Sequence, residues 1–110
     1  ARVYAEDPVS LMPSTGKLRV FRPPKLYGVR VETGFQEGQT ITPYYDAVLA
    51  KLIAKGRTRE PAIGRLFVAL KAFAIQGVQT NSALLMGIIQ HQAFLEGNID
   101  TKFLDKYKII

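Results

Sequence analysis

The chain has 110 residues, of which 47% are hydrophobic and 22% charged, so its length and composition are those of one globular domain with its own core. It contains no cysteine, which excludes disulfides and any metal site with thiolate ligands. Its apolar runs are far shorter than the roughly 20 residues that a membrane span requires. The net charge of +6 comes from basic residues scattered along the chain, which is more typical of a solvated surface than of a nucleic-acid site. We therefore expect neither a membrane nor a nucleic acid as a partner.

Turn residues and alternating apolar residues predict strands in the first half of the chain. Residues 1–8 (ARVYAEDP) are typical of a strand that leads into an acidic turn, and residues 13–16 (PSTG) are typical of a second turn. Residues 17–22 (KLRVFR) and 29–33 (VRVET) alternate between apolar and polar side chains, which is the period of a half-buried strand. Residues 47–55 (AVLAKLIAK) fit either a helix or a buried strand, and periodicity leaves both open.

Helical periodicity dominates the second half. In residues 59–74 apolar side chains recur at steps of three and four, and Thr58 before them suits an N-cap. Residues 75–78, interrupted by a glycine, predict a brief extended link, after which Thr80 or Asn81 is expected to cap a second helix. Strands followed by helices predict an α+β fold: an antiparallel sheet, formed mainly by the N-terminal half, packed with two helices from the C-terminal half.

Catalytic and metal-binding patterns are scarce. The single histidine, His91, has no Glu or His at metal-ligand spacing, so we expect it on the surface or at a helix end and predict no metal site. Glu6 and Asp7 precede a proline, where acidic residues usually organise a turn. No glycine-rich phosphate loop has the required spacing. Taken alone, the residues indicate an α+β domain and no particular reaction.

Eight short motifs nevertheless occur in a set order over nearly the whole chain. They are ARVYAEDP (1–8), PSTGKL (13–18), RPP (22–24), GVRVE (28–32), PYYD (43–46), AKLI (50–53), GVQTN (77–81) and DTKFLD (100–105). Together they resemble the C-terminal domain of biotin carboxylase, an ATP-grasp enzyme that uses ATP and bicarbonate to carboxylate biotin on a carrier protein. The resemblance implies that residues 47–55 form a strand. It also implies that ATP, Mg²⁺ and bicarbonate are bound by an ATP-grasp domain earlier in a longer parent chain, so we expect this chain alone to bind none of them and to be inactive.

The same resemblance implies catalytic roles for individual residues. Arg2 matches the family's catalytic arginine, which stabilises negative charge on the ureido oxygen of biotin. A guanidinium suits that task because it stays cationic and offers directional donors. Asp46 lies at a strongly patterned site of the family, the PYYD motif, and our hypothesis is that its carboxylate orients Arg2 through a charge-assisted pair. Thr101 aligns with a position near the adenine pocket.

Partners are implied as well. Tyr27 and Arg30 match positions at the homodimer interface of bacterial members, and both residue types are enriched at interface hot spots. The expected partners are the ATP-grasp domain of the same parent chain, the biotin carboxyl carrier protein or domain, and a second copy. A cytoplasmic location is expected, with the mitochondrial matrix as the alternative, and the acceptor (acetyl-CoA, propionyl-CoA, pyruvate or another) stays open.

Two further expectations follow from the view that this chain is one domain of a longer protein. The alternative to an enzyme part is a non-catalytic module that uses the same fold for subunit interaction. Since the resemblance places the start of this chain just before Arg2, we also expect the first strand to be frayed, because chain ends are poorly ordered unless they are tied down.

Overall fold

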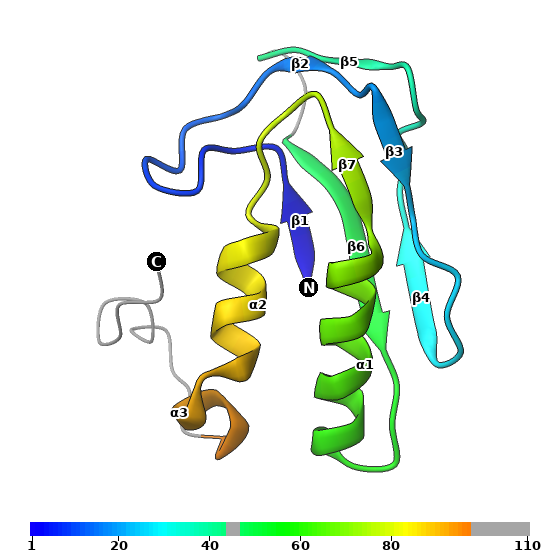
Figure 1. Cartoon of the computed structure of the whole chain (residues 1–110), viewed down its shortest axis with the longest axis vertical. Coiled ribbons are helices and arrows are strands. Elements are labelled where there is room, and N and C mark those ends of the chain that lie inside the picture. Colours follow the sequence, from blue (N-terminus) through cyan, green and yellow to red (C-terminus); the bar gives the residue numbers. More distant parts are fainter. Residues whose placement is uncertain (44–46, 98–110) are drawn as a thin grey trace.

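An antiparallel three-stranded sheet lies at the centre of the structure, a computed structural model that describes residues 1–43 and 47–97 (Figure 1). Its middle strand is β6 (Val48–Ala54), with β1 (Arg2–Tyr4) on one side and β4 (Val29–Glu32) on the other. The prediction of an α+β fold with antiparallel strands is therefore confirmed. So is the strand that the resemblance assigned where periodicity left helix and strand open.

Burial alternates along β6 and gives the sheet an inner and an outer face. Leu52 is fully buried, while Lys51 and Ile53 on either side of it are exposed. The alternation breaks at Leu49 and Ala50, which are both buried, next to a shift in the register with β1 that marks a β-bulge. The inner face belongs to the hydrophobic core, and the outer face carries polar and charged side chains.

Two helices complete the core. Helices α1 (Arg59–Ala72) and α2 (Ser82–Gln90) lie side by side in Figure 1, and the single turn α3 (Gln92–Leu95) follows them. The apolar stripe predicted for the first helix supplies Leu70 to the core, and α2 supplies Ile89. Within the described part of the chain, no helix has the length and apolar character needed to cross a membrane.

Two small sheets extend the structure: β2 (Gly16–Lys17) pairs with β5 (Thr40–Ile41), and β3 (Val20–Arg22) pairs with β7 (Ala74–Gln76). The single strand predicted for residues 17–22 was wrong. It is divided between the two small sheets, because successive residues turn to different partners. The Leu18 N–H donates to the Gln39 carbonyl at 2.8 Å, whereas the Arg19 N–H donates to the Gln76 carbonyl at 2.9 Å.

The link predicted after the first helix is also more regular than expected, since its first part is strand β7. Gly77 ends that strand with a φ of +112°, and a Cβ built on it would lie 1.8 Å from the Lys17 carbonyl oxygen. Only glycine allows two backbones to approach so closely in this conformation. The glycine that interrupts the sequence pattern is therefore required by a backbone crossing between distant segments.

Candidate functional site

Strand β1, which carries Arg2, is held along its inner edge by the central strand. Arg2 lies opposite Lys51 in the register, and the Leu52 N–H donates to the Ala1 carbonyl at 2.8 Å. Beyond the strand, the Ala5 N–H donates to the Ala47 carbonyl at 2.8 Å. The first strand was expected to be frayed, but the structure pairs it with the middle strand of the sheet from its first residues.

The other edge of β1 is held by one residue, Asn81. The Tyr4 N–H donates to Asn81 Oδ1 at 2.8 Å, Asn81 Nδ2 donates to the Arg2 carbonyl at 3.2 Å, and the Asn81 N–H donates to the Tyr4 carbonyl at 3.3 Å. Asn81 is 5% exposed and is the only buried polar or charged residue in the part of the chain that the structure describes. Sequence reasoning gave it only the role of a helix cap. The one available signal was its place at the end of the GVQTN motif.

The Arg2 side chain lies on the outer face of the sheet. Val3 and Ala5 are fully buried, so the alternation of the strand places Arg2, which is exposed, on the opposite side. The register puts Arg2 opposite Lys51 and Lys51 opposite Glu32, which forms one exposed row across all three strands. Two adjacent cations on a rigid surface favour an anionic or electron-rich group that approaches this face.

The acidic turn after β1 has the structural role that the sequence indicated. Asp7 Oδ1 accepts hydrogen bonds from the Val9 N–H at 2.8 Å and the Ser10 N–H at 2.9 Å, and these bonds, with Ser10 the larger contributor, hold the pKa of Asp7 below its ordinary value. Burial raises the pKa of Glu6. Asp7 is thus the acceptor that organises the turn.

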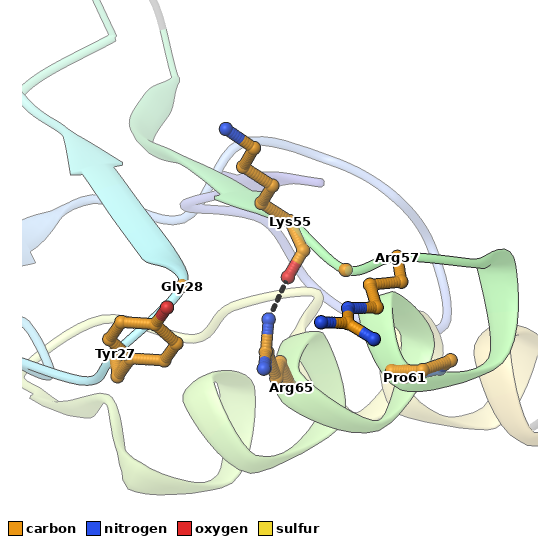
Figure 2. Close-up of a pocket in the computed structure, with 7 residues that line it drawn as sticks. Tyr27, Gly28, Lys55, Arg57, Pro61 and Arg65 are labelled. Atoms are coloured by element: carbon orange, nitrogen blue, oxygen red, sulfur yellow. Dashed lines mark hydrogen bonds between the residues drawn. The ribbon is translucent and has the colours of Figure 1, made fainter.

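A second surface surrounds Tyr27, a residue that is 89% exposed (Figure 2). The Arg65 guanidinium carbon lies 5.2 Å from the centre of the Tyr27 ring, within cation–π range, and Arg65 Nη1 donates to the Lys55 carbonyl, drawn as a dashed line in Figure 2. We call this surface the Tyr27 pocket. It has a volume of about 430 Å³ and is lined by Tyr27, Gly28, Lys55, Gly56, Arg57, Pro61 and Arg65.

Apolar side chains continue the Tyr27 pocket into a groove between the turn before β4 and helix α1. The groove has a volume of about 510 Å³, and its wall includes Leu26 and Val68, both exposed. Exposed aliphatic groups around an aromatic ring and cations are typical of a protein interface. Arg65 was not singled out from the sequence, because a lone arginine in a helix carries no signal until the fold brings it next to the Tyr27 ring.

Of the other residues singled out from the sequence, two lie among the described residues and two do not. Arg30 is exposed on the outer face of β4 and forms an ion pair with Glu32 at 3.2 Å between Nη2 and Oε1, outside the Tyr27 pocket. His91 lies between α2 and α3, where its Nδ1 accepts a hydrogen bond from the Ala93 N–H at 3.1 Å, which confirms the predicted helix-end position. Asp46 and Thr101 lie outside the described residues.

Comparison with known proteins assigns the family. The family model described as the biotin carboxylase C-terminal domain matches residues 1–106. Biotin carboxylase 1 of Bacillus subtilis (strain 168) is 39% identical over 110 residues, which cover 99% of this chain and 24% of the relative. The mitochondrial propionyl-CoA carboxylase alpha chain of Sus scrofa is 46% identical over 106 residues, covering 94% of this chain and 14% of that protein.

Solved structures of similar proteins support the same family assignment. The biotin carboxylase domain dimer of the Hydrogenobacter thermophilus 2-oxoglutarate carboxylase, in complex with MgADP, ADP and bicarbonate, superposes with a TM-score of 0.93 at 37% identity, covering 96% of this chain and 24% of that one. Pyruvate carboxylase of Rhizobium etli superposes with a TM-score of 0.94 at 35% identity, covering 98% and 10%. The chain therefore spans about a quarter or less of these relatives, and it belongs to the biotin carboxylase C-terminal domain family.

Proposed function

We propose that this chain is the C-terminal domain of an ATP-dependent biotin carboxylase and that Arg2 is its catalytic residue. The observation that carries the proposal is the position of Arg2: an exposed guanidinium on a strand whose backbone is bonded on both edges. Family membership supplies the reaction class, and the relative solved with MgADP and bicarbonate supports ATP, Mg²⁺ and bicarbonate as requirements of the parent enzyme. Biotin on its carrier is the group that is carboxylated.

Arg2 has a definite task in this reaction. Carboxyphosphate breaks down to CO₂ and phosphate, a base takes the proton from the ureido nitrogen of biotin, and that nitrogen forms the new bond to CO₂. Negative charge develops on the ureido oxygen as the proton leaves. The Arg2 guanidinium donates hydrogen bonds to that oxygen and stabilises the charge, at a position that the paired strand keeps fixed.

Binding of ATP and Mg²⁺ is assigned to the ATP-grasp domain of the same parent chain. Among residues 1–43 and 47–97, no three His, Asp or Glu side chains gather as a group that could hold a metal ion. The relatives include bacterial and mitochondrial proteins, so both the cytoplasm and the mitochondrial matrix fit the proposal.

The test is Arg2→Ala in the biotin carboxylase that contains this chain. Loss of a donor to the developing charge should slow biotin carboxylation by about 10²- to 10³-fold. ATP cleavage, which precedes the step at the ureido group, should fall much less, so carboxybiotin formed per ADP released should drop. Carboxylation at the parental rate would remove Arg2 from the reaction.

Two further variants test the other residues that the resemblance selected. If Asp46 orients Arg2, Asp46→Asn should lower the amount of carboxybiotin formed per ADP released, with little change in unfolding free energy. If Thr101 contacts adenine, Thr101→Val should raise KM for ATP.

The second part of the proposal is that Tyr27 and Arg30 contribute to a homodimer interface. Its support is the exposed aromatic and aliphatic surface of the Tyr27 pocket and its groove, together with the dimer of the Hydrogenobacter relative. Arg30→Glu should weaken the dimer in sedimentation equilibrium. Because Arg30 pairs with Glu32 inside the chain, Glu32→Gln is the matched control for loss of that ion pair alone. An unchanged dimer constant for Arg30→Glu would withdraw Arg30 from the interface.

A further inference from the structure

The hydrogen bonds of β1 alternate between two partners. Ala1 and Ala5 bond toward β6, whereas the Arg2 carbonyl and both backbone groups of Tyr4 bond to Asn81 on the opposite edge. Asn81 thus occupies the place that a neighbouring strand would take at a free sheet edge. The backbone position of Arg2 is therefore defined by two contacts, the register with Lys51 and the amide of Asn81.

The amide of Asn81 is held in one orientation. Its oxygen faces an N–H donor at Tyr4 and its nitrogen faces a carbonyl acceptor at Arg2, so a rotated amide would oppose like groups at both ends. Because Asn81 is only 5% exposed, water has little access to replace either bond. A small change at this amide therefore moves or weakens the strand at Arg2 itself.

An asparagine at this position would ordinarily cap the helix that follows it. Asn81 is at the N-cap position of α2, yet its side chain makes no capping hydrogen bond to that helix. The Ser82 N–H is bonded instead by Thr80 Oγ1, at 3.4 Å. The hydrogen-bonding capacity of the Asn81 side chain is used on β1, next to the residue to which we assign the chemistry.

We propose that Asn81 is a positioning residue of the carboxylation reaction, which holds the Arg2 guanidinium at the place where charge develops on biotin. The inference rests on the function proposed for Arg2. It assigns the Asn81 amide to the carboxylation step, because the amide sets the position of Arg2. Displacement of a catalytic group by about 1 Å can slow a reaction about 10²-fold.

The experiment uses the complete biotin carboxylase and measures carboxybiotin formed per ADP released, with kcat and KM for biotin and the melting temperature of each variant. Asn81→Asp keeps an acceptor for the Tyr4 N–H but sets an oxygen against the Arg2 carbonyl. Asn81→Ala removes both side-chain bonds without adding charge. Ser82→Ala is the matched control, because it changes the next residue of the same segment, whose hydroxyl accepts a hydrogen bond from Thr80.

We expect both Asn81 variants to lower the ratio of carboxybiotin to ADP by about 10- to 100-fold through kcat, and Ser82→Ala to leave it within about twofold. In an Arg2→Ala background, Asn81→Ala should lower the ratio no further, because Asn81 acts through Arg2.

Three results would overturn the inference: a parental ratio in both Asn81 variants, a parallel loss of ATP cleavage and carboxylation as a purely structural role predicts, or a further full decrease in the Arg2→Ala background. The function proposed for Arg2 is tested separately by Arg2→Ala alone. If that variant lowers the ratio and the Asn81 variants do not, only the present inference fails.

Discussion

The edge of the sheet at Arg2 and the Tyr27 pocket are both exposed surfaces, but they are built in opposite ways. At the Arg2 edge, backbone groups are bonded to the central strand and to a buried asparagine, and only the guanidinium reaches outward. At the Tyr27 pocket, the side chains of Tyr27 and Arg65 contact each other, and Tyr27 is 89% exposed. A fixed backbone suits a group that must meet a developing charge, whereas adaptable side chains suit contact with another protein. Substitutions that disturb each region should differ accordingly.

The largest effect is expected at Gly77, four residues before Asn81, where two backbones cross. Gly77→Ala places a Cβ against the Lys17 carbonyl and forces an unfavourable φ, so we expect a loss of more than about 3 kcal/mol of unfolding free energy in urea titration. Gly97→Ala is the matched control: its φ is +79°, but nothing lies within 4 Å of the added methyl group, so only strain of about 1 kcal/mol remains. Equal losses for the two variants would show that the crossing itself contributes nothing.

The next effect compares the two faces of β6, which pairs with β1 at the Arg2 edge and ends just before Lys55 of the Tyr27 pocket. Leu52→Ala removes a fully buried side chain from β6 and should cost about 3 kcal/mol, since the cavity is surrounded by packed core. Ile53→Ala, one residue further and 41% exposed, should cost less than about 1 kcal/mol in the same urea titration. If Ile53→Ala proved as costly as Leu52→Ala, the assignment of an open outer face would be contradicted.

The fold could be predicted largely because its signals are local. Helix α1 follows from apolar residues at steps of three and four, and β4 from alternation in VRVET. The stretch that became β6 could not be settled by periodicity, since a bulge makes two consecutive residues buried, and only the resemblance decided it. Residues 17–22 alternate like one strand, but their division into β2 and β3 is set by Gln39 and Gln76, which are distant in the sequence.

The candidate site could be predicted only in part. Arg2, Tyr27 and Arg30 were selected through the resemblance to the family, and the structure places each of them on the surface. Asn81 gave only the signal of a helix cap at the end of GVQTN, and Arg65 gave none, because their contacts join segments that are distant in the sequence. Asn81 bonds to Tyr4 and Arg2, which are 77 and 79 residues away, and Arg65 reaches Tyr27 from another element. Residues whose role is to hold another residue become visible only once the chain is folded.

A smaller effect is expected at the Tyr27 pocket. Tyr27→Ala should change the unfolding free energy of the chain by no more than about 0.5 kcal/mol, because the ring is mostly in solvent. Arg65→Met should cost about 1 kcal/mol, since it loses the bond to the Lys55 carbonyl as well as the ring contact. A double-mutant cycle between the two should give a coupling of about 0.5 kcal/mol. A coupling of zero would mean that the ring and the guanidinium do not interact in solution.

The smallest effect concerns the acidic turn next to the Arg2 edge. Hydrogen bonds from Ser10 and Val9 hold the pKa of Asp7 below 3.8, so its stabilising contribution is present above that ordinary value and is lost as the pH falls through the lower folded-state pKa. Burial raises the pKa of Glu6 above 4.5, so ionisation of Glu6 disfavours the folded state as the pH rises through 4.5 and beyond. In an NMR titration, the Val9 and Ser10 amide signals should shift with a midpoint below 3.8, and the Glu6 signal with one above 4.5. Asp7→Asn should abolish the lower transition and keep the upper one. A single shared midpoint for both carboxyl groups would mean that the turn does not hold Asp7, and with it the segment that leaves the Arg2 edge, in the observed geometry.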